Sequence, residues 1–267
     1  RDTDRSRGLG DVYKRQQEVR APQNEIDPIF DEFGFEYSTA GRISDQSELH
    51  RMNEICRIKG RAGVGLLSAL PVVDKRYGLP GLEDDVDSGR WIEADMQTPQ
   101  GYVITVVCVY VHAGNTDDPE KMKQKYRFLD TMLIRMEQLR DEAAHGGKQA
   151  VLCGDFNIAH TPLDIKNAKA NETHAGFLPE ERAYVDKWLG ELEFVDVMRN
   201  LAGDIQGPYT WWSQRGRAFD NNVGWRIDYQ FATPELAETA CGFVIDKAPT
   251  YDLRWSDHAP LSIMYDI

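Results

Sequence analysis

One short segment of the sequence carries three polar side chains directly after an apolar run. The run Val151-Leu152-Cys153 ends at Gly154, and Asp155, Asn157 and His160 follow. Residues two apart in an extended chain point the same way, so Asp155 and Asn157 are expected to face one pocket. A carboxylate beside an amide oxygen suits a hard cation such as Mg²⁺, while the amide nitrogen can instead donate to a phosphate. An Asx turn that closes the strand is the purely structural alternative.

A second group of residues pairs acids with a histidine. Asp257 and His258 are adjacent near the C-terminus, where the acid can hold a metal and the imidazole can act as acid or base. Asp228 lies in an alternating segment, on the side opposite Ile227 and Tyr229. A half-buried aspartate needs a partner, and a histidine that it holds in orientation is the natural one.

Two further residues have both a functional and a plain structural interpretation. Tyr110 ends a long apolar run, and its hydroxyl either lies in solvent or donates to a phosphate oxygen. Glu18 is either a metal ligand or an ordinary surface glutamate. For neither residue does the residue type by itself show which interpretation is correct.

The apolar pattern predicts the elements that must position these residues. Several apolar runs are typical of buried strands, and the last of them alternates with a period of two: residues 62–73, 102–111, 150–153 and 226–232. Asp118 followed by Pro119 predicts a helix start, and apolar residues then recur at three- and four-residue steps until the helix ends near His145. A second helix is predicted over 179–190. Mixed strands and helices indicate one layered α/β or α+β domain.

The composition is that of an ordinary globular protein. Of the 267 residues, 41% are hydrophobic and 28% are charged, and the formal net charge is −13. This charge weakens a polyanion-binding interpretation without excluding it, because a metal site is itself acidic and residues 42–76 are locally basic. No window is apolar enough to span a membrane. Four widely spaced cysteines predict reduced core thiols in a cytoplasmic protein.

Taken in order, these motifs resemble the endonuclease/exonuclease/phosphatase superfamily and, within it, the exonuclease III class of abasic-site endonucleases. The resemblance runs from Gln17 to the C-terminus and includes "GRAGVGLLSALPV", "GRWIEAD", "GDFN", "HTPLDIKNAKAN", "YTWWSQRGRAFDNNVGWRIDY" and "RWSDHAPL". It implies a four-layered α/β sandwich with two mixed β-sheets packed face to face and helices outside. It also implies a monomer that uses Mg²⁺, for which Mn²⁺ substitutes, and that cuts duplex DNA at abasic sites and from 3′ ends.

The resemblance assigns a metal-binding role to one set of residues. Glu18 would be the principal Mg²⁺ ligand, and Asp257 a further member of the metal site. The complete set that it implies is Glu18, Asp155, Asn157, Asp257 and His258. Whether one ion or two bind there stays open.

The resemblance also assigns catalytic roles. Asp155 would orient or deprotonate the attacking water, or protonate the leaving 3′ oxygen. Asn157 would hold a phosphate oxygen, and Tyr110 would add a hydrogen bond to the developing charge. His258, oriented by Asp228, would bind the scissile phosphate or act as a base. Cation, imidazole and neutral donors that converge on one phosphate suit the negative charge of a phosphodiester transition state.

A third implied set faces the DNA. An arginine-rich loop within an aromatic segment is expected to approach the minor groove and the abasic pocket, with Lys166 on a neighbouring loop. The residues of this set are Lys166, Arg215, Arg217, Trp225 and Arg226. Trp211 is predicted to lie in the core, and a solvated arginine loop beside a tryptophan core is the structural alternative.

The start of the chain departs from the resemblance. The family begins with a buried strand, and residues 1–16 contain no apolar run of that kind. We therefore expect residues 1–16 to be a lead-in unrelated to the family, such as a cloning or gene-assembly scar. Residues 17–267 are then the catalytic domain without its first strand.

Two alternatives to an active nuclease stay open. The altered start raises the possibility of a catalytically impaired DNA-binding remnant, which would bind abasic duplex without cutting it. The superfamily also includes phosphatases and phospholipases, which comparison of abasic DNA with inositol phosphates would separate from a nuclease.

Overall fold

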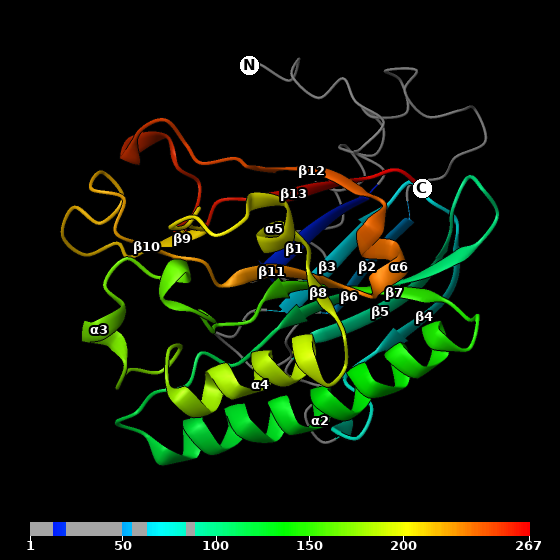
Figure 1. Ribbon diagram of the computed structural model, residues 1–267, viewed down its shortest axis with the longest axis horizontal. Helices are drawn as coiled ribbons and strands as arrows, with labels where there is room; N and C mark the ends of the chain where they lie inside the picture. Colours follow the sequence, from blue (N-terminus) through cyan, green and yellow to red (C-terminus); the bar gives the residue numbers. More distant parts are fainter. Residues whose placement is uncertain (1–12, 20–49, 55–62, 84–88) are drawn as a thin grey trace. The chain divides into compact units, whose positions relative to one another are not determined.

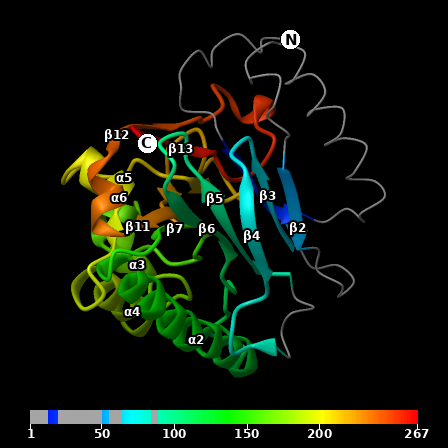
Figure 2. The same cartoon turned by 90° about the vertical axis from the view of Figure 1, so that its right-hand side faces the viewer.

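The computed structural model describes residues 13–19, 50–54, 63–83 and 89–267 (Figure 1, Figure 2). For the first two of these segments the description covers the backbone alone. The chain divides after Tyr110 into two compact units, with the last residue, Ile267, grouped with the first unit. Each unit has its own antiparallel strand ladders.

A three-stranded sheet belongs to the first unit. β3 (Gly63–Ser68) pairs antiparallel with β1 (Tyr13–Val19) on one side and with β2 (His50–Glu54) on the other. All six β3 residues are buried, as expected of an apolar central strand. β1 runs across the boundary predicted between residues 16 and 17. The division into a lead-in and a domain stays a prediction, and most of the lead-in lies outside the described residues.

A second ladder of the first unit corrects one predicted strand. The apolar run 62–73 is not continuous, because β3 ends before Pro71 and β4 (Val72–Tyr77) begins after it. Proline lacks a backbone N–H, and the Ser68 hydroxyl accepts the Leu70 N–H at 3.0 Å, so the chain turns there. β5 (Trp91–Gln97) then pairs antiparallel with both β4 and β6 (Val103–Tyr110).

The second unit contains the ladder that carries the chemistry. β11 (Asp228–Ala232) lies between β7 (Gln149–Asp155) and the short β8 (Val195–Asp196), antiparallel to both. Its register places Asp228 opposite Asp155. The polar face predicted for β11 is only partly present, since Gln230 is 1% exposed and accepts a hydrogen bond from the Tyr265 hydroxyl. Two carboxylates therefore meet at one end of a buried ladder.

Two helices of the second unit agree with the predicted pattern. α2 (Pro119–Ala144) begins after Asp118, whose side chain accepts the Lys121 N–H, and α4 (Pro179–Gly190) has the predicted bounds. They lie side by side in both views (Figure 1, Figure 2), and the rings of Tyr126 and Tyr184 stack with centroids 6.3 Å apart. The shorter helical segments are η2 (Pro162–Asp164), α3 (Ala168–Asn171), α5 (Val197–Ala202), α6 (Pro234–Glu238) and η3 (Tyr251–Leu253).

Two antiparallel pairs complete the second unit. β9 (Trp211–Trp212) pairs with β10 (Gly224–Trp225), and β12 (Ala240–Ile245) pairs with β13 (Leu261–Tyr265). A single β-bridge between Trp211 and His258 links the first pair to the loop before β13. The predicted fold class, a mixture of α and β elements with several sheets, is confirmed.

The cysteines and the helices answer two questions raised by composition. Cys108 and Cys153 are free and fully buried, as predicted, whereas Cys241 is free and exposed, so the prediction of a core thiol is wrong there. Cys56 lies outside the described residues. Within the part of the chain that the structure describes, no helix has the length and apolar character needed to cross a bilayer.

Candidate active site

Asp228 and His258 form the hydrogen-bonded pair predicted from their residue types. His258 Nδ1 lies 2.9 Å from Asp228 Oδ2, and His258 Nε2 lies 3.9 Å from Asp155 Oδ2. The exposed fractions of these side chains are 3% for Asp155, 13% for Asp228 and 21% for His258. With Nδ1 donating to Asp228, the imidazole is held in one orientation and Nε2 faces Asp155.

The backbone around this pair is fixed by two hydroxyl groups that sequence reasoning missed. Thr210 is fully buried, and its Oγ1 accepts the N–H groups of Ile227 (3.2 Å) and Asp228 (3.1 Å). The Ser256 hydroxyl accepts the His258 N–H at 3.1 Å. Hydroxyl side chains are suited to such caps because they accept local N–H groups outside regular structure. Nothing in the sequence marks Thr210, whose partners lie 17 and 18 residues away.

Asn157 combines the two interpretations that the sequence left open. Its backbone is left-handed, with φ of 51°, and its N–H donates to Asp155 Oδ1 at 2.8 Å, which is an Asx turn. Its Nδ2 donates to Val111 O (2.9 Å) and to Asp155 Oδ2 (3.1 Å). Both amide hydrogens are thus used within the protein. The remaining amide oxygen favours a cation over a phosphate as the partner of this side chain.

A buried ion pair lies under this turn and was also missed. Lys125 Nζ is 2.5 Å from Glu181 Oε1, with both side chains fully buried, and it donates to Asn157 O at 2.9 Å and to Ala113 O at 3.1 Å. Glu181 Oε2 accepts the N–H groups of Gly176 and Leu178. One signal was present in the sequence, since Lys125 occupies a position on the apolar face of its helix.

The carboxylates around His258 change its pKa. Burial by itself would lower the pKa of His258, but the carboxylates of Asp228, Asp155 and Asp257 raise it to about 10. The imidazole is therefore charged at neutral pH. Three carboxylates (−3) and one imidazolium (+1) leave the carboxylate–histidine cluster, which comprises Asp155, Asp228, Asp257 and His258, with a net charge of −2.

The donor set of the cluster fits a hard cation. Carboxylate and amide oxygens with surplus negative charge are the chemistry that Mg²⁺ and Mn²⁺ prefer. Asp257 Oδ2 accepts the Trp211 indole N–H at 3.0 Å, which holds that carboxylate in place. Among the described side chains, no three acidic, histidine or cysteine groups converge closely enough to hold an ion by themselves. The Glu18 side chain lies outside this description, so its role as a ligand stays a prediction.

Tyr110 stays a prediction as well. It ends β6 in the first unit, whereas the carboxylate–histidine cluster belongs to the second. Its ring is half-buried beneath the guanidinium of Arg90, whose Cζ lies 4.7 Å from the ring centroid. Arg90 also donates to the Tyr110 carbonyl at 3.1 Å.

One predicted DNA-binding residue is wrong. Arg226 is fully buried, where its Nε donates to Asp164 Oδ1 at 2.7 Å and its Nη1 donates to Asp196 Oδ1 at 3.0 Å. Arg199 donates to the same Asp164 oxygen at 2.5 Å. All donors of Arg226 face the interior, so it stabilises the protein and cannot reach a nucleic acid. Asp164, Asp196, Arg199 and Arg226 are called the buried ion network below.

The other residues of the predicted DNA-binding set are accessible. Lys166, Arg215 and Arg217 are exposed, and Trp225 is half-buried with its ring 6.1 Å from that of Trp211 in an edge-to-face arrangement. The core position predicted for Trp211 is only partly correct. Trp211 is half-buried and reaches Asp257, while its neighbour Trp212 is 2% exposed.

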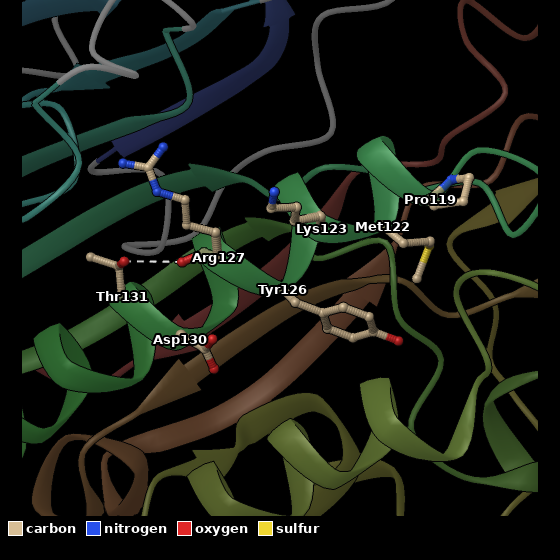
Figure 3. A pocket seen from close by; sticks show the side chains of 7 residues that line it. All are labelled: Pro119, Met122, Lys123, Tyr126, Arg127, Asp130 and Thr131. Carbon is tan, nitrogen blue, oxygen red and sulfur yellow. Dashed lines mark hydrogen bonds between the residues drawn. The ribbon is translucent and has the colours of Figure 1, made fainter.

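A surface hollow lies along α2 and shares no residue with the carboxylate–histidine cluster. Figure 3 shows the α2 side chains that line it: Pro119, Met122, Lys123, Tyr126, Arg127, Asp130 and Thr131. Asp130, its acidic member, accepts the Tyr184 hydroxyl at 2.5 Å. The described lining comes from one helix and brings together no set of groups that would carry out chemistry.

Comparison with known proteins shows that this chain is similar to DNA nucleases. An exodeoxyribonuclease of Bacillus subtilis is 32% identical over 209 residues, which cover 78% of this chain and 76% of that protein. An AP endonuclease from Archaeoglobus fulgidus has a TM-score of 0.78 and 28% identity, over 96% of this chain and 89% of that chain. A 3′-5′ exonuclease (NExo) from Neisseria meningitidis has a TM-score of 0.76 and 26% identity, over 96% and 90%.

The family itself is shown by a match along most of the chain. The model of the Endonuclease/Exonuclease/phosphatase family matches residues 17–258, a span that holds every member of the carboxylate–histidine cluster. Nucleases of this family use divalent metal ions, in keeping with the surplus negative charge described above. The chain belongs to the endonuclease/exonuclease/phosphatase family.

Proposed function

We propose that this protein is a DNA-repair nuclease that hydrolyses phosphodiester bonds at abasic sites and from the 3′ ends of duplex DNA. One observation carries the proposal: a net negative carboxylate–histidine cluster lies within a chain similar to an exodeoxyribonuclease, an AP endonuclease and a 3′-5′ exonuclease. A monomer that acts in the cytoplasm remains our expectation.

In this mechanism the cluster holds the scissile phosphate so that the attacking water lies opposite the leaving 3′ oxygen, and the new bond from water to phosphorus forms as the bond to that oxygen breaks. His258, charged and oriented by Asp228, donates from Nε2 to a nonbridging phosphate oxygen. Asp155 orients the attacking water or passes a proton to the leaving 3′ oxygen, and both alternatives use the same carboxylate. The Asx turn and Lys125 keep Asp155 and Asn157 in fixed positions.

Mg²⁺, with Mn²⁺ as a substitute, is the proposed cofactor. Asp155, Asn157 and Asp257 supply oxygen donors in the described part of the site, and Glu18 is the further ligand that we propose. When bound, the ion would supply positive charge that stabilises the negatively charged transition state. His258 then completes the positive side of the site and is not needed as a ligand.

Cleavage of a synthetic abasic duplex tests the proposal. The parent protein should cut the strand 5′ to the abasic residue with Mg²⁺ or Mn²⁺ and should lose this activity with EDTA. Asp155→Asn should reduce cleavage by about 10²–10⁴-fold, because the proton-transfer and orienting group is removed. Asp204→Asn, a change of the same type at an exposed loop position, is the matched control and should cleave like the parent.

Three outcomes would contradict the proposal. Equal cleavage by Asp155→Asn and Asp204→Asn would show that the cluster takes no part in the reaction. Binding of abasic duplex without metal-dependent cleavage would identify a DNA-binding remnant, and release of phosphate from inositol phosphates in place of DNA cleavage would identify a phosphatase.

A further inference from the structure

Three apolar side chains stand in solvent just before the carboxylate–histidine cluster. Tyr251, Leu253 and Trp255, called the apolar ridge here, have exposed fractions of 40%, 61% and 102%. Burying a tryptophan side chain removes 150–250 Å² from water, in round numbers, so a tryptophan left fully exposed forgoes a large stabilisation. Exposed apolar groups that lie together mark surfaces that bind a partner.

The ridge is fastened to the loop that carries two exposed arginines. Phe219, 6% exposed, contacts Tyr251 edge-to-face with ring centroids 6.3 Å apart. Lys247 Nζ donates to Phe219 O at 3.3 Å and to Asn222 Oδ1 at 3.1 Å. Arg254 lies over the Tyr251 ring at 3.9 Å. Since these contacts join residues 247–255 to residues 219–222, the ridge belongs to the same scaffold as Arg215 and Arg217.

The position of Trp255 relates the ridge to the site. Trp255 precedes Asp257 by two residues, and two extended residues span at most about 7 Å. Successive bases along one strand are about 3.4 Å apart, so this span equals roughly two base steps. The following residues are held in place, because the Ser256 hydroxyl accepts the His258 N–H and Trp211 bridges to His258.

We propose that Trp255 stacks on an exposed base face of the DNA substrate, one or two nucleotides from the bond that is cut. This inference rests on the proposed nuclease function and adds a positioning residue to it. Exposed cations and an exposed aromatic ring on one scaffold match a nucleic acid strand, in which phosphates and base faces alternate. A 3′ end or an abasic gap offers such a face, whereas an intact duplex buries its base faces against one another.

Equilibrium binding in EDTA tests this proposal without cleavage. Fluorescence anisotropy would compare a 3′-recessed duplex, an abasic duplex and a covalently closed duplex circle without ends or gaps, all with protein that carries Asp155→Asn. Adding Trp255→Ala should weaken binding to the first two by roughly 5- to 150-fold, the range of one base–aromatic stack, and leave binding to the circle nearly unchanged. Trp255→Phe should restore most of the affinity. Ile134→Ala, at another exposed apolar residue (57%), is the matched control and should bind like the background protein.

The salt dependence of binding separates stacking from charge. Trp255→Ala should leave the slope of log Kd against log salt unchanged, because no phosphate contact is lost, whereas Arg215→Ala should reduce it. One outcome would overturn the stacking role alone. In it, Trp255→Ala and Ile134→Ala bind the 3′-recessed duplex equally well, while the parent protein, which keeps Asp155, cleaves DNA. Absence of both DNA binding and cleavage by the parent would overturn the nuclease proposal together with it.

Discussion

Two charged groups meet at the start of β11 and behave in opposite ways. Arg226 and Asp228 are two residues apart, yet the first belongs to the buried ion network and the second to the carboxylate–histidine cluster. In the network, two arginines balance two aspartates, and Arg226 and Asp164 are fully buried. In the cluster, three carboxylates surround one imidazole that is 21% exposed.

The network and the cluster differ in charge balance and in access to solvent, not in residue type. A buried ion pair keeps its charges satisfied from within and has no capacity left for a substrate. A cluster with surplus charge of one sign needs a partner from outside, and the raised pKa of its histidine is typical of functional sites. The first arrangement holds a backbone segment in place, and the second acts on a ligand.

Removing the imidazole should have the largest effect, and that effect should be on activity. His258→Gln should lower the rate of abasic-duplex cleavage by about 10²–10⁴-fold, because the charged donor facing the phosphate is lost. The free energy of unfolding should change by only about 1 kcal/mol, since the glutamine amide can still donate to Asp228. Cleavage assays and urea denaturation of the same preparation would check both values. A large loss of stability would mean that the cluster is structural.

Removing the buried guanidinium should have the reverse effect. Arg226→Met should lower the free energy of unfolding by about 3–5 kcal/mol, because Asp164 and Asp196 would each lose a partner while buried. Arg217→Met, at an exposed arginine nine residues earlier, should stay within about 0.5 kcal/mol of the parent. Urea denaturation followed by circular dichroism measures both variants. Unchanged stability with weakened DNA binding in Arg226→Met would return Arg226 to the DNA-binding set.

Lowering the pH should weaken the stabilisation that the buried ion network provides. Burial by itself would raise the pKa of Asp164, but Arg226 and Arg199 lower it from 3.8 to about 2. Because the folded pKa lies below the unfolded one, the stabilisation is complete above about pH 4 and is lost as the pH falls toward 2. It amounts to about 2 kcal/mol. The fall in unfolding free energy between pH 4 and pH 2 should be smaller in Asp164→Asn than in the parent, and equal slopes would contradict this assignment.

The smallest effect on activity is expected where the two kinds of interaction combine. Lys125 is buried with Glu181, as in the network, but it also donates to the carbonyl of Asn157. Lys125→Met should lower kcat about tenfold with little change in KM, because the Asx turn loses its support while substrate contacts remain. Lys123→Met, at an exposed lysine of the same helix, is the control. Loss of stability with unchanged kcat would make Lys125 purely structural.

Local patterns predicted much of this molecule. The Asp118–Pro119 start gave the correct first residue of α2, and the second predicted helix has the bounds of α4. Alternation in residues 226–232 placed Asp228 on its own side of a strand, and residue chemistry then indicated a histidine partner. The helix bounds and the strand alternation depend on neighbours within a few residues, which a sequence displays directly. The histidine partner of Asp228 lies 30 residues away and followed from residue chemistry instead.

Features that depend on distant partners could not be predicted in this way. Arg226 finds its partners 62 and 30 residues away, and an arginine in an aromatic-rich loop has the same appearance whether it is buried or exposed. The support of Thr210 for β11 likewise depends on a contact across 18 residues. Pro71 shows the opposite case, since a local signal was present and an uninterrupted strand was nevertheless predicted.

The anchoring of Arg226 also has a consequence for how this enzyme can change over time. Because the buried ion network fixes the chain just before Asp228, we expect side chains in the loops at residues 213–223 and 246–255 to be replaceable without shifting Asp228. Mutations in these loops should therefore alter which DNA ends or lesions are preferred while the bond-breaking chemistry persists. We therefore expect selection to change the substrate preference of this protein more readily than its reaction.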